Sequence, residues 1–502
     1  MFTVTAFRIH GATLVPEAQL QAALAPWLNR PITFAELEQA VEAVAGVYGE
    51  QGWLARPQLP VQELSDGVVT INVTESRLGQ VRIDDGGLML GFDRERLTQA
   101  ATARQQPGQP LRPEDIERAI SLLNETPGLR AGAVLAAGQS PGETDIVLLP
   151  VDQPLWNGSA QLDNEGVRST GAVRLSGNVA LNSPSGIGDQ LLLSGNTSGA
   201  GNEYGWLSYS LPLGNDGWRV GANASALQYR LEGEFAALGA YGSAQTFGLY
   251  ASYPLLRTRL HSLTLTLALG KRDFLNKASG QVVSDKRLTG VGAALGGNEG
   301  DFWGGGGFTS WGANLSSGDV KLSASPAYEA ADAAGPRTAG RYTRLAWSLA
   351  RLQPVSERSA LWFSGSGQFA SKNLDSAEKF SLGGFNGVRA YPSLEGTGDT
   401  GWLVNAEWRL YSQPGLQWSA YYDIGQVRVN RDQGFVGAPT LNHVMLQGVG
   451  VGLNWTQPGR FAVVALLARR VGSNPLANPT TGKDSDGSMH TFRAWIGLAA
   501  YF

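Results

Sequence analysis

The feature that most restricts the fold is an alternation of apolar and other residues that begins near Asn157 and continues to Phe502. Between Leu263 and Leu269, for example, every second residue is leucine. Successive side chains of a β-strand point to opposite faces, so a period of two predicts strands with one apolar face. Segments of about ten such residues, separated by turns rich in Gly, Asn, Asp and Pro, are typical of a transmembrane β-barrel. We therefore expect a barrel over residues 154–502.

This part of the chain contains sixteen such segments, and an even number is what a bacterial single-chain barrel requires. The expected fold is a 16-stranded antiparallel transmembrane β-barrel. The segments lie near 158–164, 171–181, 189–198, 202–211, 218–229, 244–252, 261–274, 286–297, 303–316, 341–354, 360–370, 401–411, 416–429, 445–456, 461–471 and 489–502.

A soluble all-β protein, such as a propeller or a repeated sandwich, is the alternative. A soluble sheet of this size would carry more charge on its solvent face, whereas Lys and Glu are scarce within these segments. Aromatic residues near many segment ends favour the barrel, as does a last segment that ends in Phe502 and resembles the final strand of outer-membrane barrels. A helical membrane protein is excluded, because the longest apolar run, Phe461–Ala468, has eight residues and a membrane helix needs about 18.

Residues 1–153 have helical periodicity instead and divide into two small α+β modules, 1–76 and 77–153. Each has the order strand, helix, helix, strand, strand, and an internal repeat of this kind predicts an array of modules. The first should contain a strand at 3–9, helices that begin at Pro16 and at the capping box Thr33–Glu36, and strands at 59–64 and 68–73. The second should contain strands at 79–83, 129–137 and 144–151, and helices at 93–103 and 113–124.

Composition and motifs give no support for an enzyme. The net charge is −4, with 39 basic and 43 acidic residues spread along the chain, so no basic patch indicates nucleic acid. The absence of cysteine excludes disulfides, thiol chemistry and cysteine metal sites. The four histidines lie far apart, and no phosphate loop is present. The sequence from Asp484 to Gly487 suggests calcium, but no Glu closes the loop, which favours a polar loop tip. We expect no catalytic residues, no metal, no nucleotide and no cofactor.

One motif lies in the longest connection between strands, near 371–400. It contains Phe380-Ser381-Leu382-Gly383-Gly384-Phe385-Asn386-Gly387-Val388-Arg389-Ala390-Tyr391-Pro392, followed by Gly398-Asp399. The segment resembles the inward-folded loop of the outer-membrane protein-assembly superfamily, whose core is Val-Arg-Gly-Tyr or Val-Arg-Gly-Phe. The Leu-Gly-Gly before the core, and the Tyr-Pro and Gly-Asp after it, are similar in particular to the two-partner secretion transporters (TpsB type). In that family two POTRA modules precede a sixteen-stranded barrel, which is the order expected here.

The resemblance implies a site inside the barrel. Arg389 would extend into the lumen and pair with Asp423, which belongs to an Asp-x-Gly sequence on the thirteenth strand. A bidentate carboxylate would hold an arginine on a long loop better than water does. Ala390 replaces the usual glycine, which would cost on the order of 1 kcal/mol if that position needs a positive φ. The residues implied are the loop motif Val388, Arg389, Ala390 and Tyr391, the loop support Gly383 and Gly384, and Asp423 and Gly425 on the strand.

The resemblance also implies a function. An outer-membrane transporter would recognise the N-terminal secretion domain of a large exoprotein through POTRA modules in the periplasm, and would secrete it unfolded through the barrel without ATP. The partners implied are outer-membrane lipid and one exoprotein, whether adhesin, haemolysin, contact-dependent toxin or haem-acquisition protein. An insertase that assembles other barrels shares the loop motif but usually carries more POTRA modules. A passive porin needs neither the modules nor the loop.

The first residues, Met1–Val4, lead directly into a strand pattern without the basic, apolar and small-residue regions of a signal peptide. We therefore expect either a cytosolic protein or a mature chain. The helix that plugs the barrel in many relatives does not appear in this sequence, so the resemblance leaves the gating of the pore and a plugged resting state unassigned.

Overall fold

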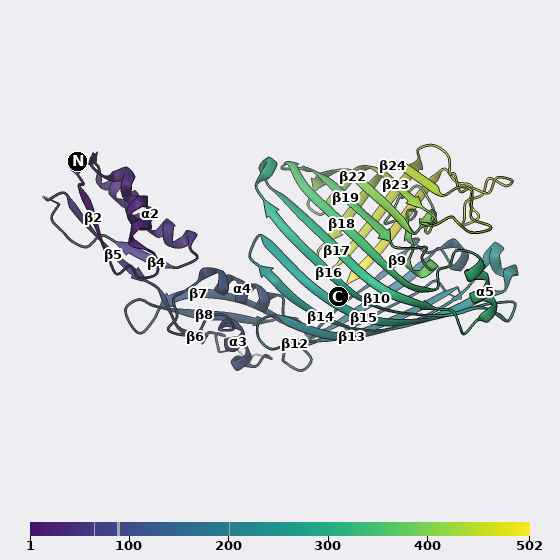
Figure 1. Cartoon of the computed structure of the whole chain (residues 1–502), viewed down its shortest axis with the longest axis horizontal. Helices are drawn as coiled ribbons and strands as arrows, with labels where there is room; N and C mark the ends of the chain where they lie inside the picture. The colour runs from purple at the N-terminus through teal and green to yellow at the C-terminus, as the bar shows by residue number, and fades with distance from the viewer. Residues whose placement is uncertain (65, 88–90, 200) are drawn as a thin grey trace.

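The computed structural model describes residues 1–64, 66–87, 91–199 and 201–502. Two small α/β modules are followed by a closed barrel of sixteen strands (Figure 1). The modules lie at one end of the barrel, and the long connections between strands lie at the other (Figure 1). No helix in the described ranges is both long and apolar enough to cross a membrane.

The first module is a three-stranded sheet packed against two helices. Its elements are β1 (Phe2–Thr3), β2 (Ala6–His10), α1 (Glu17–Leu24), η1 (Ala25–Trp27), β3 (Pro31–Ile32), α2 (Phe34–Glu50), β4 (Ala55–Gln58) and β5 (Val68–Glu75). The sheet has the order β2-β5-β4, with β2 parallel and β4 antiparallel to β5. The predicted capping box begins α2, because the Glu36 N–H donates to Thr33 Oγ1 (3.2 Å) and the Thr33 N–H donates to Glu36 Oε2 (2.8 Å).

The strand predicted at 59–64 is wrong, since β4 ends at Gln58 and residues 59–64 form a loop. Pro60 has no N–H to offer a ladder. The side chain of Gln62 takes the place of a paired strand beside Thr70: Gln62 Nε2 donates to the Thr70 carbonyl (2.8 Å), and the Thr70 N–H donates to Gln62 Oε1 (2.7 Å). The apolar pattern that predicted a strand therefore belongs to a loop that is fastened by one side chain.

The second module repeats the arrangement. Its elements are β6 (Arg77–Ile83), α3 (Arg94–Ala101), α4 (Pro113–Asn124), β7 (Leu129–Ala137) and β8 (Glu143–Asp152). The sheet order is β6-β8-β7, with β6 parallel and β7 antiparallel to β8. Pro113 occupies the first position of α4, where its missing N–H and fixed φ suit a helix start.

The barrel is a single closed antiparallel sheet, and each of the sixteen predicted segments corresponds to one of its strands, which confirms the predicted fold class. The strands are β9 (Trp156–Asp163), β10 (Arg174–Asn182), β11 (Gln190–Thr197), β12 (Asn202–Leu213), β13 (Trp218–Arg230), β14 (Ala240–Arg257), β15 (His261–Ala278), β16 (Gln281–Asp301), β17 (Gly307–Lys321), β18 (Gly340–Ser356), β19 (Ser359–Ala370), β22 (Thr400–Gln413), β23 (Leu416–Arg428), β24 (His443–Gln457), β25 (Phe461–Arg470) and β26 (Phe492–Tyr501).

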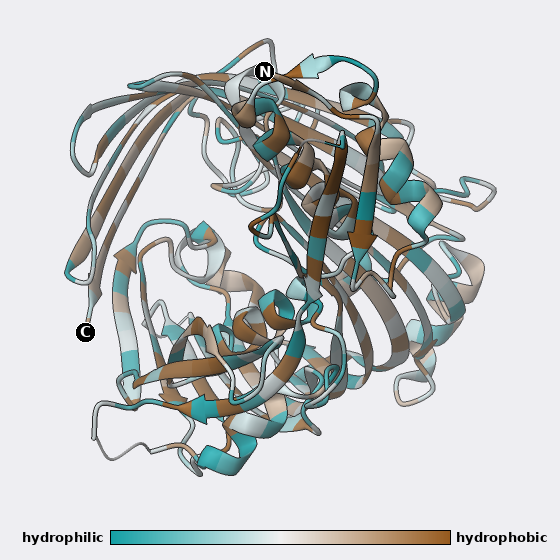
Figure 2. Cartoon of the chain, turned by 90° about the vertical axis from the view of Figure 1, so that its left-hand side faces the viewer, coloured by the Kyte–Doolittle hydropathy of each residue, from teal (hydrophilic) through white to brown (hydrophobic). Residues whose placement is uncertain are grey.

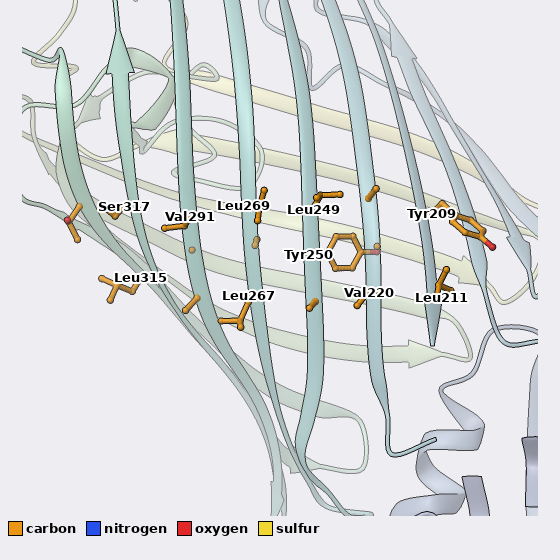
Figure 3. A pocket seen from close by; sticks show the side chains of 17 residues that line it. Tyr209, Leu211, Val220, Leu249, Tyr250, Leu267, Leu269, Val291, Leu315 and Ser317 are labelled. Carbon is orange, nitrogen blue, oxygen red and sulfur yellow. The ribbon is translucent and has the colours of Figure 1, made fainter. Parts of the chain in front are cut away.

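The two faces of the barrel differ in chemistry, and the bands of hydropathy colour along its strands show the alternation (Figure 2). Leucine and valine side chains of neighbouring strands point outward, among them Leu249, Leu269, Val291 and Leu315, which are 42%, 52%, 61% and 54% exposed (Figure 3). With the alanines between them, these residues line a hollow of about 1080 Å³ on the outer wall. The outer face is therefore an apolar surface of the kind that hydrocarbon covers.

Candidate functional site

The connection between β19 and β22, residues 371–399, folds into the barrel, and we call it the inward loop. Its two ends are joined by the short strands β20 (Phe380–Ser381) and β21 (Thr397–Gly398). A Cβ on Gly383 would lie 2.2 Å from the Pro392 carbonyl oxygen, and Gly384 has a φ of 114°. The backbone of the loop therefore requires glycine at both positions. The family resemblance had suggested these two glycines as support for the loop.

Arg389 extends from this loop to the wall of the barrel, where the structure brings it to Asp423 on β23. The guanidinium donates from Nε to Asp423 Oδ2 (2.9 Å) and from one Nη to Oδ1 (2.6 Å), and the Arg389 backbone N–H donates to the same carboxylate (3.1 Å). Arg389 is 7% exposed and Asp423 is 0% exposed. A buried pair with three charge-assisted hydrogen bonds fixes both the position and the orientation of the arginine.

Further residues complete the arginine site. Glu407 on β22 accepts a hydrogen bond from Arg389 (2.7 Å), and Asn405 Nδ2 donates to Asp423 Oδ1 (2.8 Å). The Tyr421 ring lies 3.4 Å from the guanidinium carbon, a cation–π contact. Trp495 Nε1 on β26 donates to the Arg389 carbonyl (2.8 Å). The alternation from Trp402 to Leu410 already puts Asn405 and Glu407 on one face, and alternation along the next strand puts Tyr421 on the face of Asp423. No signal in the sequence indicates Trp495.

The remaining motif residues form the apolar floor of the loop. Val388, Ala390 and Tyr391 are all 0% exposed and pack with residues of β22–β25. Ala390 is not among the residues with a positive φ, so the alanine that replaces the family's glycine causes no backbone strain. Gly448 provides the room for its methyl group, because a Cβ there would lie 2.8 Å from the Ala390 Cβ.

Gly425 lies two residues after Asp423 on the same face of β23. A Cβ on Gly425 would lie 2.6 Å from a Leu382 methyl and 2.8 Å from the Trp402 carbonyl oxygen. Gly425 therefore lets Leu382, at the start of the motif segment, pack against the strand.

A second arginine, Arg470, belongs to the barrel wall and binds the loop, whereas Arg389 belongs to the loop and binds the wall. The sequence did not predict this contact. Arg470, at the end of β25, donates from Nε to the Ala390 carbonyl (3.2 Å), and its guanidinium lies 4.7 Å from the Tyr391 ring centre. The same guanidinium makes a two-point pair with Asp484, whose side chain is 0% exposed. The acidic sequence that suggested calcium is thus paired with arginine, because Asp486 likewise pairs with Arg493 (2.9 Å).

The first half of the inward loop is fastened to other strands. Lys286 on β16 donates to both oxygens of Asp375 (2.7 and 2.8 Å), and both side chains are almost fully buried. Glu378 pairs with Arg272 on β15 and with Arg344 on β18. The inward loop is therefore fastened by ion pairs to β15, β16, β18, β22 and β23, and by the hydrogen bond from Arg470 to β25.

The second module is joined to the barrel by a separate polar cluster. Asp216, in the turn between β12 and β13, accepts hydrogen bonds from Arg104 (2.8 Å) and from the Tyr253 hydroxyl (2.6 Å). Arg118 on α4, with a side chain 5% exposed, donates to the Asp216 backbone carbonyl (3.2 Å). A further ion pair links Arg257 to Glu125 (2.6 Å). Burial raises the pKa of Asp216, but the hydrogen bonds from Arg104 and Tyr253 outweigh burial, so the pKa lies below its ordinary 3.8.

These features define a class of membrane protein: a sixteen-stranded barrel, preceded by small α/β modules, whose lumen holds a loop fastened by an arginine. The chain belongs to the haemolysin secretion/activation protein family ShlB/FhaC/HecB, whose profile matches residues 142–455, more than half of the chain. The profile of the ShlB-type POTRA domain matches residues 2–76.

Individual relatives agree with this family. The heme/hemopexin transporter protein HuxB of Haemophilus influenzae is 25% identical over 493 residues, which are 96% of this chain and 84% of HuxB. The outer membrane transporter CdiB of Escherichia coli is 26% identical over 444 residues, 82% of this chain and 70% of CdiB.

Two solved structures have the same fold. The structure of CdiB from Escherichia coli aligns with a TM-score of 0.77 and 22% identity, covering 100% of this chain and 90% of that one. The structure of BamA from Haemophilus ducreyi lacking POTRA domains 1-3 aligns with a TM-score of 0.56 and 14% identity, covering 100% of both chains.

The protein is therefore an outer-membrane transporter of the two-partner secretion type, with its barrel in the outer membrane and its POTRA modules in the periplasm. The predicted family, function and location are confirmed, and the transporter is favoured over the insertase. A secreted exoprotein is the kind of partner that this family implies. That the relatives are transporters is consistent with a chain that is not an enzyme.

Proposed function

We propose that the two POTRA modules take up the N-terminal secretion domain of one large exoprotein, and that this exoprotein crosses the barrel as an unfolded chain. The observation that carries the proposal is the fastening of the inward loop. Arg389 holds the loop to Asp423 and Glu407, and Arg470 holds it from β25, two strands further along the same wall. A loop that is held at several points leaves a defined passage through the barrel. A loose loop of the same length would obstruct this passage.

The modules offer a surface that suits an extended peptide. β7 is an edge strand of the second module, because the sheet order is β6-β8-β7. The outer side of β6 is partly occupied, since the Leu78 N–H donates to the Gln109 carbonyl (2.9 Å) and the Gly108 N–H donates to the Leu78 carbonyl (2.6 Å). Beside β7, a hollow is lined by Ile116 and Ile120 of α4 and by Leu135. An added strand would pair with β7 and place alternate side chains in this hollow.

We further propose that Val388, Arg389, Ala390 and Tyr391, with Gly383 and Gly384, act as one positioned element, and that Asp423 and Gly425 are its seat on the wall. The apolar outer face would contact outer-membrane lipid. The proposal needs no nucleotide, metal or cofactor, because the work of the site is to hold a loop in place.

Deletion of residues 1–76 tests the role of the modules. We expect the exoprotein to disappear from the culture medium while the barrel remains folded in the outer membrane, because the first module does not contribute strands to the barrel. Mass spectrometry of the medium would compare the deletion with the full chain and with a strain that lacks the transporter. The exoprotein is identified as the large protein that is present in the medium only when the full-length transporter is produced.

Heat-modifiable migration of the barrel on gels is the control for folding. Unchanged secretion by the deletion variant would contradict the proposed role of the modules.

A further inference from the structure

One part of the barrel wall differs from the rest in its lumenal chemistry. The pairing between strands shows which side chains of β10–β14 face the lumen. Asp163 on β9 is lumenal, and Ser176 lies on the same face of β10. The partners of this face can then be followed across β11–β14. We call the lumenal side chains of β10–β14 the neutral wall. Within these fully described strands, its middle carries no charged side chain and is lined by short polar groups and a few aromatic rings, with the apolar Leu192 and Leu227 between them. The polar and aromatic lining includes Ser176, Ser194, Trp206, Ser208, Asn223 and Thr246.

Charge occurs only at the two ends of the neutral wall. Arg174, at the outer end, is paired with Asp163 (2.9 Å) and Glu165 (3.1 Å). Arg219, at the periplasmic end, donates to Ser210 Oγ (2.9 Å) and to the Gly188 carbonyl (2.9 Å). Between these ends, in strands that the structure describes completely, no lumenal side chain carries a charge.

The wall outside β10–β14 is both charged and covered. Lys286, Arg344, Asp423 and Arg470 all face the lumen, and each is bound to the inward loop. In contrast, no hydrogen bond or ion pair between described residues joins the inward loop to β10–β14. The links that come closest lie at the two borders of these strands: Ser393 donates to the Glu165 carbonyl, which lies before β10, and Glu378 pairs with Arg272 on β15, the strand next to β14. The inward loop therefore covers one side of the lumen and leaves the neutral wall free.

Open space adjoins the neutral wall. A hollow of about 290 Å³ is lined by Asn223, Thr246 and Gly248 on one side and by Arg272 and Glu378 on the other. The lumenal side chains of β13 and β14 therefore face this open hollow and are not covered by other described side chains.

The neutral wall also begins where the second POTRA module is attached. Asp216, which holds Arg104 of that module, lies in the turn that joins β12 to β13. Arg257, which pairs with Glu125 at the C-terminal end of α4, is the last residue of β14. A chain that leaves this module on the barrel side therefore reaches the periplasmic end of the neutral wall first.

We propose that the neutral wall is the track along which the unfolded exoprotein crosses the barrel, with its peptide groups exchanging hydrogen bonds with the hydroxyl and amide groups of β10–β14. This inference rests on the proposed transport of an unfolded chain and assigns its route.

The chemistry of the wall suits this task. For a chain to pass through a pore, its binding to the wall must be favourable enough for the chain to enter. The individual binding sites must also be weak and numerous enough for the chain to leave. Neutral hydroxyl and amide groups give each peptide group a hydrogen-bonding partner whose net contribution is small. An ion pair in a narrow lumen would hold a passing charged residue far longer. Side chains such as Trp206 and Tyr250 offer flat surfaces to apolar residues of any shape.

The natural chain has no cysteine, so single-cysteine variants of the full chain can map the route. The lumenal variants are Ser194→Cys and Asn223→Cys. Their matched controls are Leu193→Cys and Ala224→Cys, one position along the same strands and on the lipid side. Leu446→Cys, on β24 and 0% exposed beneath the inward loop, reports the opposite wall.

Each variant would be reconstituted in lipid bilayers and exposed to an unfolded peptide of Gly, Ser, Asn and Thr that carries one activated disulfide. We expect adducts to form about tenfold faster in the two lumenal variants than in the three others, because thiol reactivity follows exposure. Equal rates at lumenal and lipid-facing positions would overturn the proposal. Faster reaction of Leu446→Cys, or no adduct at Ser194→Cys and Asn223→Cys, would also overturn it.

This result does not depend on an exoprotein. Loss of secretion on deletion of residues 1–76, together with equal labelling rates, would retain the transport function and remove the neutral wall as its route. Unchanged secretion after the deletion, together with the expected labelling, would remove the role of the modules alone.

Discussion

At the scale of single residues, the motif alanine and a distant glycine form a pair. The methyl group of Ala390 occupies the space that a side chain on Gly448 would need. Gly448 belongs to a lumenal row in which it pairs with Asp423 on one side and Arg470 on the other. The departure from the family's glycine is therefore compensated on β24, which the sequence alone could not indicate.

We predict that Gly448→Ala disturbs the seat of the loop and that Ala390→Gly repairs it. The added Cβ would lie 2.8 Å from the Ala390 Cβ, and overpacking of this kind typically costs about 1–3 kcal/mol. Secretion should fall in the single variant and return in the double variant, because the pair then exchanges one methyl group for another. The amount of exoprotein in the medium, relative to transporter in the membrane, measures the effect.

Gly205→Ala on β12 is the matched control, because nothing lies within 4 Å of a Cβ there. It should secrete normally. Equal loss in Gly448→Ala and in the Gly448→Ala, Ala390→Gly double variant would show that the methyl exchange does not govern the loop.

The arginine site divides into what the sequence could and could not predict. The pairing of Arg389 with Asp423 follows from resemblance to a motif, and Glu407 shares a predicted strand face with Asn405. Alternation also places Tyr421 on the face of Asp423. Arg470 and Trp495 contact the loop only because of its folded path, and no spacing in the sequence records that path. Their assignment needed the structure.

At the scale of elements, alternation predicted the barrel strands well because it covers many residues per strand. The short strands of the modules are harder, as β4 shows. There an apolar stretch beside a turn looked like a strand at 59–64, while the structure satisfies the Thr70 backbone with the Gln62 side chain. When a side chain replaces the backbone hydrogen bonds of a neighbouring strand, the sequence shows no periodic pattern that would reveal it.

The junction between α3, α4 and the barrel should respond to pH. The pKa of Asp216 is lower in the folded protein than its ordinary 3.8. Its contribution to the junction is therefore fully present above pH 3.8 and is lost as the pH falls through the lowered pKa. We expect Asp216→Asn to loosen the second module at pH 7, and acid to loosen it in the natural chain but to have less effect in the variant.

Distances between spin labels on introduced cysteines, one on the second module and one on the barrel, would measure this loosening. Asp115→Asn is the control, since its carboxylate lies 3.9 Å from Arg112 of its own module and, among the described residues, forms no ion pair with the barrel. A distance distribution unchanged by Asp216→Asn would contradict the assigned role of the cluster.

At the scale of the whole molecule, the charges of the lumen are divided between two sides. The ion pairs of β15–β18 and β22–β25 hold the inward loop, whereas β10–β14 keep a neutral face that starts at the attached POTRA module. Lumenal charges on these strands thus serve to position one loop. The low charged fraction of the sequence, 16%, follows from this division and from a lipid-facing surface on the other side.

The measurement that tests the central claim most directly is the fate of the exoprotein in the Arg389→Ala variant, with the exposed Arg460→Ala as control. Removing Arg389 leaves Asp423 buried and short of its charged partner, and breaking a buried pair typically costs about 3–5 kcal/mol. Our account predicts that the exoprotein is lost from the medium while other outer-membrane proteins keep their normal levels. A general fall in outer-membrane proteins, or normal secretion by the variant, would contradict it.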